Sequence, residues 1–246
     1  MADEALKDQV AGPAEPGSRP LRADAARNRE AVLSAAREVF AEIGLGAPLE
    51  EIARRAGVGI GTLYRRFPAR EQLVSAALID KITAYAVAAE RALAEPDPWD
   101  GFAGFVRRIC AMQAGDRGLA DLLLITLAPS EELEAIRARA NRAMIRLIDR
   151  AKAAGRLRTD MVGEDLLLML IGNSAIAAAA GRDAPPALPR FVALMLDAFQ
   201  PRPGADLPPA PSTAQMRRVM SRLAAEHGCG QPPGCQTRTQ PEKGPQ

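Results

Sequence analysis

The sequence predicts an all-α protein with about nine helices. Aromatic residues make up only 4% of the chain, whereas Ala and Leu are abundant. This composition favours packed helices over sheets, which prefer aromatic and β-branched residues. Apolar residues also recur at helical spacing in a series of stretches that Gly or Pro separates, as expected for helices that bury one face.

Composition also bounds the class of protein. The 246 residues are 48% apolar and 25% charged, as in a soluble globular protein with one large or two smaller domains. Three scattered cysteines are too few for a disulfide framework. The first 19 residues lack the apolar segment of a signal peptide, and the most apolar run, residues 166–180, is shorter than the ~18 continuous residues of a membrane span. We therefore expect a cytoplasmic protein without a membrane partner.

The first 23 residues mix Ala, Gly, Pro and acidic residues without periodicity, which predicts a flexible arm. Asp24 can cap the first helix, whose inner face would carry Val32, Val39 and Phe40. Gly44 ends this helix in the usual C-terminal manner.

Residues 49–67 are the most informative stretch of the chain. The first half places apolar residues at helical spacing. Gly57 then permits the positive φ of a sharp bend, and Val58 supplies an apolar wedge behind it. A second short helix would run from about Ile60 to Phe67. Such a helix-turn-helix places its second helix in the major groove of DNA, although an ordinary helical hairpin with a solvated basic face would give a similar pattern.

Residues 24–78 resemble the DNA-binding domain of the TetR (tetracycline-repressor) family of bacterial transcriptional regulators. The resemblance covers the first third of the chain and rests on Ile52-Ala53, Ala56-Gly57-Val58, Gly61-Thr62-Leu63-Tyr64, Phe67 and Leu73. The sequence departs from the family at Ala47-Pro48, where a Ser or Thr that caps the helix and touches phosphate is common. The resemblance implies a three-helix DNA-binding domain over residues 24–70 and a larger helical effector-binding and dimerisation domain over residues 71–200.

Positive charge is concentrated in the part of the chain that resembles the DNA-binding domain. Residues 19–70 contain ten Arg, no Lys and six acids, a balance of +4, whereas the whole chain has a net charge of +2. Such a basic module suits phosphate binding. The predicted DNA contacts are Arg54, Gly59, Ile60, Gly61, Thr62, Tyr64, Arg65, Arg66 and Arg70. Leu63 and Phe67 are assigned to the core instead.

The remaining segments predict a helical body. A fourth helix from Arg70 to about Leu93 would join the DNA-binding domain to the body, and its tilt is the family's means of changing the spacing of two recognition helices. Asp97 and Ser130 are expected to cap the fifth and seventh helices. The sixth, eighth and ninth helices are expected at about residues 119–127, 164–180 and 188–199.

The eighth and ninth segments are apolar nearly all round, which implies burial on more than one side. In the family these two helices pair with their copies in a second subunit, so the resemblance implies a homodimer. The alternative is a pair of helices buried inside one monomer. The predicted interface residues are Leu167, Ile171, Ala175, Ala178, Phe191 and Met195.

Residues 201–246 form a Pro- and Gly-rich extension. Within it, Ser212 and Gln215 have the spacing of a capping box, which predicts a short helix over residues 213–226. The sequence leaves open whether this helix packs on the body or remains loose. The rest of the extension is expected to be disordered.

An effector pocket would have mainly apolar walls. The candidates are Trp99, Phe102, Phe105, Cys110, Met112 and Met144, although aromatic residues and Met at helical spacing are first of all core residues. Such a pocket predicts a small, mainly apolar or aromatic effector.

No pattern predicts an enzyme, a cofactor or a metal site. The glycines of residues 57–61 lack the dinucleotide-binding spacing. His227 is the only histidine, and with Cys229 and Cys235 it supplies three metal ligands rather than the usual four. The sequence therefore predicts a ligand-responsive transcriptional regulator, a repressor that binds a palindromic operator as a homodimer. One alternative is a helical small-molecule-binding protein or enzyme whose DNA-binding head has lost its function. A second is a DNA-bound structural or activating partner that takes no ligand.

Overall fold

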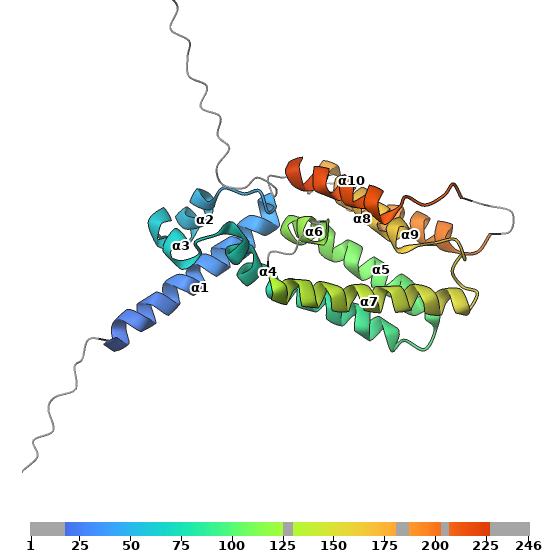
Figure 1. Ribbon diagram of the computed structural model, residues 1–246, viewed down its shortest axis with the longest axis horizontal. Helices are drawn as coiled ribbons and strands as arrows, with labels where there is room; N and C mark the ends of the chain where they lie inside the picture. The colour runs from blue at the N-terminus through green and yellow to red at the C-terminus, as the bar shows by residue number, and fades with distance from the viewer. Residues whose placement is uncertain (1–17, 125–129, 181–186, 203–206, 227–246) are drawn as a thin grey trace, which may run out of the picture.

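The computed structural model describes residues 18–124, 130–180, 187–202 and 207–226, and these form ten helices and no strand (Figure 1). The all-α prediction is confirmed. Three helices form a lobe at one end, which we call the head: α1 (Ser18–Ile43), α2 (Leu49–Arg55) and α3 (Ile60–Arg66). The other helices form an elongated body, and α4 (Arg70–Leu93) runs from the head into it.

The first helix starts earlier than the sequence suggested. Helix α1 begins at Ser18, so Asp24 lies inside the helix and forms an ion pair with Arg27 rather than a cap. The Ala- and Arg-rich segment around Asp24 consists of good helix formers, which carry the helix past the predicted start. Residues 1–17 of the predicted arm lie outside the described residues.

One apolar core joins the helices of the head. Phe40 from α1, Ile52 from α2 and Leu63 from α3 are fully buried, and Leu73 from the first turn of α4 is buried with them. The guanidinium of Arg29 lies over the ring of Phe67 at 5.7 Å. The side chains predicted to face inward from residues 49–67 therefore do so.

The body contains α5 (Pro98–Ala114), α6 (Arg117–Leu124), α7 (Glu131–Ala153), α8 (Gly163–Ala180) and α9 (Ala187–Phe199), and α4 packs along α7. Both predicted caps form. Asp97 accepts hydrogen bonds from the backbone N–H groups of Trp99 (2.7 Å) and Asp100 (3.0 Å), and Ser130 accepts one from that of Leu133 at 3.3 Å.

The C-terminal helix α10 (Thr213–Glu226) packs on the body, which resolves the question that the sequence left open. Its two inward methionines, Met216 and Met220, are buried, and the helix contacts α6. The predicted capping box is present: the N–H of Ser212 donates to Oε1 of Gln215 at 2.8 Å, and the N–H of Gln215 donates to Oγ of Ser212 at 3.3 Å.

Helix α6 holds the head against the body, and it begins at Arg117 rather than at residue 119. Gly118 lies so close to α1 that an added Cβ would be 2.9 Å from Cβ of Phe40 and 3.0 Å from its carbonyl oxygen. The N–H of Leu45 donates to Oδ2 of Asp121 at 2.8 Å, and Lys81 of α4 pairs with Asp116 before α6. A glycine is therefore required at the point where α6 crosses α1.

Two of the described helices, α4 and α8, are long and apolar enough by length and composition to cross a membrane. For α4 the explanation is burial, because half of its most apolar stretch lies inside the fold. Only 22% of the corresponding stretch of α8 is buried, so this helix leaves an apolar side on the surface of the monomer.

Replacing Gly118 by Ala should lower the free energy of unfolding by about 1–2 kcal/mol, because overpacking against Phe40 outweighs the gain in helix propensity. The matched control is Gly104→Ala in α5, where an added Cβ would meet no atom within 4 Å. That control should gain about 0.5–1 kcal/mol. Urea unfolding followed by circular dichroism measures both; equal shifts in the two variants would contradict the close contact.

Candidate functional site

The turn between α2 and α3 is a hydrogen-bonded C-terminal helix cap. The N–H of Val58 donates to the carbonyl of Ala53 at 3.0 Å, and the N–H of Gly57 donates to that of Arg54 at 3.2 Å. This pair of bonds defines a Schellman motif, which requires a left-handed residue after the helix. Gly57 is that residue, with φ of 66°, and the half-buried Val58 packs on the core. The predicted bend and its apolar wedge are both present.

Helix α3 turns one residue inward and most of the others outward. Leu63 is fully buried, whereas Tyr64 is 47% exposed and Ile60 is 37% exposed. Thr62 is half-buried, and its N–H donates to the carbonyl of Gly59 at 2.8 Å. We call residues 59–62 and 64–66 the recognition face.

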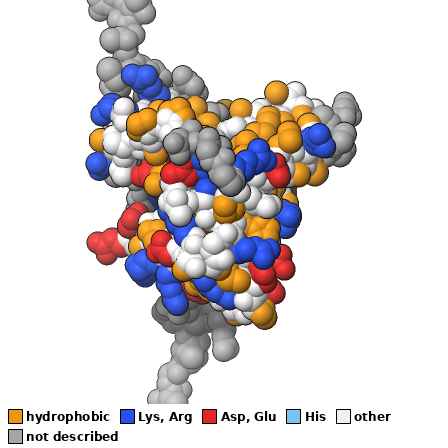
Figure 2. All heavy atoms as spheres, turned by 90° about the vertical axis from the view of Figure 1, so that its right-hand side faces the viewer, with side chains coloured by type: hydrophobic (Ala, Val, Ile, Leu, Met, Phe, Trp, Pro, Cys, Tyr) orange, Lys and Arg blue, Asp and Glu red, His pale blue; other side chains and the backbone are white. Residues whose placement is uncertain are grey.

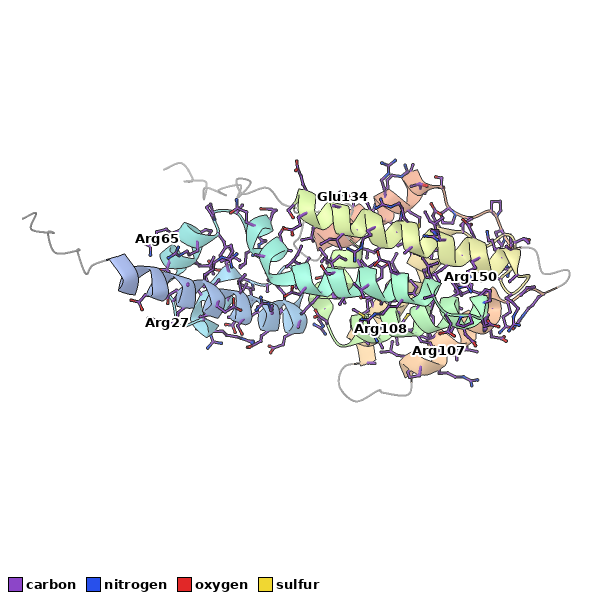
Figure 3. All side chains as sticks on the ribbon, turned by 90° about the horizontal axis from the view of Figure 1, so that it is seen from below. Arg27, Arg65, Arg107, Arg108, Glu134 and Arg150 are labelled. Atoms are coloured by element: carbon purple, nitrogen blue, oxygen red, sulfur yellow. The ribbon has the colours of Figure 1, made fainter. Side chains whose placement is uncertain are left out.

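The recognition face has open space and uncompensated positive charge. An added Cβ at Gly59 or Gly61 would meet no atom within 4 Å, so another molecule can approach the backbone closely there. Arg65 and Arg66 are exposed, and among the described residues neither forms an ion pair. Figure 3 shows Arg65 on the outer side of the head.

The arginines of α2 are engaged by carboxylates instead. Glu51 accepts hydrogen bonds from Arg54 at 2.7 and 2.8 Å and from Arg55 at 2.8 Å, and Arg55 also donates to Glu42 at 2.7 Å. The hydrogen bonds from Arg54 and then Arg55 lower the pKa of Glu51 to about 2. The same contacts raise the pKa of both arginines. Glu51 of α2 and Glu42 of α1 therefore largely compensate the positive charge of α2, whereas no ion pair within the described residues compensates Arg65 and Arg66 of α3.

Arg70, also a predicted DNA contact, anchors the loop before α2. Its Nη1 donates to the carbonyl oxygens of Leu45 (2.7 Å) and Ala47 (2.8 Å). Pro48 occupies the position before the first helical residue, and it offers no side-chain cap. The loop that lacks a capping hydroxyl is thus held by an arginine from α4, a contact that spacing along the sequence could not indicate.

Two protein-family models match the chain. The model of bacterial regulatory proteins of the tetR family matches residues 32–77, and the model of the SbtR-like transcriptional regulator C-terminal domain matches residues 97–201. A TetR transcriptional regulator from Streptomyces coelicolor is 35% identical, over 70% of this chain and 98% of its own, with a TM-score of 0.46.

The chain belongs to the TetR family. A TetR regulatory protein from Mycobacterium vanbaalenii is 34% identical over 74% of this chain and 99% of its own, with a TM-score of 0.41. The TetR-family regulator PfmR from Thermus thermophilus shares the fold at 19% identity and a TM-score of 0.53, over 69% of this chain and 96% of its own. Comparison with curated proteins found no match. TetR-family proteins are DNA-binding transcriptional regulators rather than enzymes, and the head of this chain has their helix-turn-helix.

The predicted interface residues of this TetR-family protein lie in different surroundings. Ile171 is half-exposed, and Ala175 and Ala178 are exposed on the surface of α8. Phe191 packs against Gly172, where an added Cβ would be 3.1 Å from the ring. Leu167 lines a cavity and Met195 packs on the core.

The sequence reasoning missed the two largest exposed apolar side chains of α8 and α9. Leu168 is 45% exposed and Leu194 is 51% exposed. Figure 2 views the end of the body away from the head, and apolar side chains gather in its upper part. Helices α8, α9 and α10 lie along the upper side of the body in Figure 1.

Most of the predicted pocket residues pack together in the body. Phe102, Phe105 and Cys110 are buried, and the ring centroids of Trp99 and Phe102 are 5.9 Å apart. Burial raises the pKa of the Cys110 thiol to about 12. Met112 is half-buried against the same core. Phe105 also borders an open groove of about 580 Å³ between α4 and α5.

Met144 borders a different cavity, of about 510 Å³, whose walls come from α4, α6, α7, α8 and α10. Tyr85, Leu170, Met216 and Met220 line it too, and the sequence singled out none of these four as ligand contacts. The methionine spacing in α10 was a usable signal, because it marked an apolar face in need of a partner.

A buried polar pair explains the interruption of the apolar run in α8. Nδ2 of Asn173 donates to the carbonyl of Cys110 and to Oε1 of Gln113, both at 3.1 Å. These bonds join α8 to α5 inside the body. The three weak metal-ligand candidates at positions 227, 229 and 235 lie outside the described residues.

Replacing Gly57 by Ala should destabilise the head by about 1–2 kcal/mol, because a non-glycine residue is strained at a left-handed φ. Gly61→Ala is the matched control: it has open space within α3, and it should gain up to about 1 kcal/mol. Urea unfolding measures both variants. Two variants of equal stability would contradict the role assigned to the cap at Gly57.

Proposed function

We propose that this TetR-family protein is a cytoplasmic repressor that binds a palindromic operator as a homodimer and is released by a small, mainly apolar effector. The observation that carries the proposal is the recognition face of α3. It combines exposed hydroxyl and guanidinium groups with glycines that leave the backbone open. The homodimer would hold two such faces at a fixed spacing, and the effector would change that spacing.

In DNA binding, contacts with phosphates would supply most of the affinity, and contacts with bases would supply the specificity. Arg65 and Arg66 would contact phosphates, with affinity gained from counterion release. Thr62 and Ile60 can contact thymine methyl groups in the major groove, and the Tyr64 hydroxyl suits a phosphate. Arg54 and Arg70 remain predicted DNA contacts. Both side chains also form hydrogen bonds within the protein, so their first role is to stabilise the head.

A homodimer would present two recognition faces to successive major grooves, as a palindromic site requires. The apolar side of α8 and α9 supports this proposal. Leu168, Ala175 and Ala178 of α8 and Leu194 of α9 are exposed in the single chain, and Ile171 of α8 is half-buried. Exposed apolar patches commonly mark interfaces.

Release by an effector would be a shift between two conformations of the dimer. A ligand that binds one conformation more tightly moves the equilibrium toward it by that difference in affinity. Helix α4 contributes both to the core of the head and to the wall of the body cavity. It is therefore placed to respond to a ligand and to move the head.

Tyr64→Phe and Arg65→Ala should each weaken binding to the duplex upstream of the protein's own gene by about 5- to 150-fold, or 1–3 kcal/mol. Arg65→Ala should also reduce the slope of log K against log salt concentration by about 1. Fluorescence anisotropy with labelled duplex measures both effects, and circular dichroism checks the fold.

Arg107→Ala is the matched control, because Arg107 is an exposed arginine on α5 in the body (Figure 3). It should leave DNA affinity unchanged. Equal affinities for the wild type and both head variants would refute the assignment of the recognition face. A complete lack of salt-sensitive DNA binding would favour the alternative, a small-molecule-binding protein with an inactive head.

Leu168→Glu should convert the dimer to a monomer, because a carboxylate would be buried without a partner at the proposed interface. Ile145→Glu is the control, since Ile145 is 46% exposed on α7. It should leave the dimer intact. Sedimentation velocity measures the mass of each variant, and a wild type that sediments as a single chain even with DNA would refute the dimer.

A further inference from the structure

The cavity bordered by Met144 has an apolar floor and a polar rim. Tyr85, Met144, Leu170, Met216 and Met220 are all buried and form the floor. The rim carries exposed or half-buried polar groups from α7, α8 and α10: Glu134, Arg137, Asn141, Glu164, Thr213 and Arg217. At about 510 Å³, the cavity has the size of a small-molecule site.

Helix α10 is part of this cavity although it lies outside both family matches, the second of which ends at residue 201. It contributes Met216 and Met220 to the floor and Thr213 and Arg217 to the rim. The hydroxyl of Thr213 donates to Oε1 of Glu164 at 2.8 Å, which fastens the start of α10 to α8. Helix α10 therefore has a defined position as a wall of the cavity, although Met216 and Met220 do not belong to the core cluster of the body.

The lining chemistry selects a class of ligand. Two acids and two arginines line the rim, so their formal charges balance and a net charge on the ligand gains little. Tyr85 is neutral near pH 7 as an ordinary tyrosine is, and burial raises its pKa further, to about 12. Methionines adapt their shape to an apolar ligand, and Asn141 offers both a donor and an acceptor.

We propose that this cavity is the effector site and that α10 is one of its walls, so that the site is incomplete without the C-terminal helix. Its ligand is an uncharged, mainly apolar molecule with one hydrogen-bonding group. The inference rests on the proposed effector-responsive function and adds to it the place of the site and the class of ligand.

The test uses the full chain and two fluorescent probes with the same aromatic body, neutral N-phenyl-1-naphthylamine and its sulfonated analogue 8-anilino-1-naphthalenesulfonate. The neutral probe should bind with a fluorescence increase, and the sulfonate should bind at least tenfold more weakly. No binding of the neutral probe, or equal affinity for the two, would overturn the proposal.

Two variants locate the probe. Ala138→Trp fills the cavity from α7, and Met216→Asp places a charge on the floor contributed by α10. Each should weaken the neutral probe at least tenfold. The matched controls are Ala135→Trp on the exposed side of α7 and Val219→Asp on the exposed side of α10. Neither control residue lines the cavity, and neither substitution should change probe affinity by more than twofold.

Loss of binding in Ala138→Trp but not in Met216→Asp would overturn the role of α10. Unchanged binding in both variants would overturn the cavity assignment. DNA affinity without probe is measured on the same proteins, which separates the two proposals. If the protein binds DNA and neither variant changes probe affinity, this inference alone is refuted. If the protein binds the probe in the cavity but does not bind DNA, the repressor function alone is refuted.

Discussion

The hydrogen-bonded cap at the end of α2 is the constraint on which the recognition face depends. The N–H groups of Gly57 and Val58 reach back to the last turn of α2, which fixes where the chain leaves the helix. That exit direction sets α3 so that Leu63 enters the core of the head. Because Leu63 points into the core, the helical periodicity directs Tyr64 and Arg65 toward the outside of the head. A local backbone requirement at one glycine thus decides which side chains of α3 are exposed.

The head is held to the body by close packing and a few polar contacts. Gly118 permits α6 to touch Phe40, and Asp121 accepts from the backbone of Leu45. The bond from Leu45 reaches the loop before α2, which Arg70 also holds through the carbonyl oxygens of Leu45 and Ala47. The loop lacks a capping hydroxyl, and it is fixed instead by groups from α4 and α6. The departure from the family at Ala47-Pro48 therefore does not leave the start of α2 unsupported.

The sequence predicted most local features, although not the start of α1, and it predicted few long-range partners. The bend at Gly57 and the caps at Asp97 and Ser130 depend on neighbours within a few residues, so their spacing was sufficient. The contacts of Arg70 with carbonyls more than 20 residues earlier, and the cavity wall from α10, depend on how helices meet in space. Periodicity marked Phe102 as apolar and inward-facing, but it could not distinguish a packed core from a cavity. The pairing of Glu51 with Arg54 and Arg55 was not predicted, although the sequence could have indicated it, because those residues are three and four positions apart.

Helix α4 has the geometry of a lever arm. Its 24 residues form one uninterrupted helix, which gives a length of about 36 Å. A pivot of about 5° at one end of such a rod displaces the other end by about 3 Å, roughly the length of a hydrogen bond. A small side-chain adjustment beside Tyr85 that tilts α4 can therefore displace the head end of the helix by enough to break a hydrogen bond there.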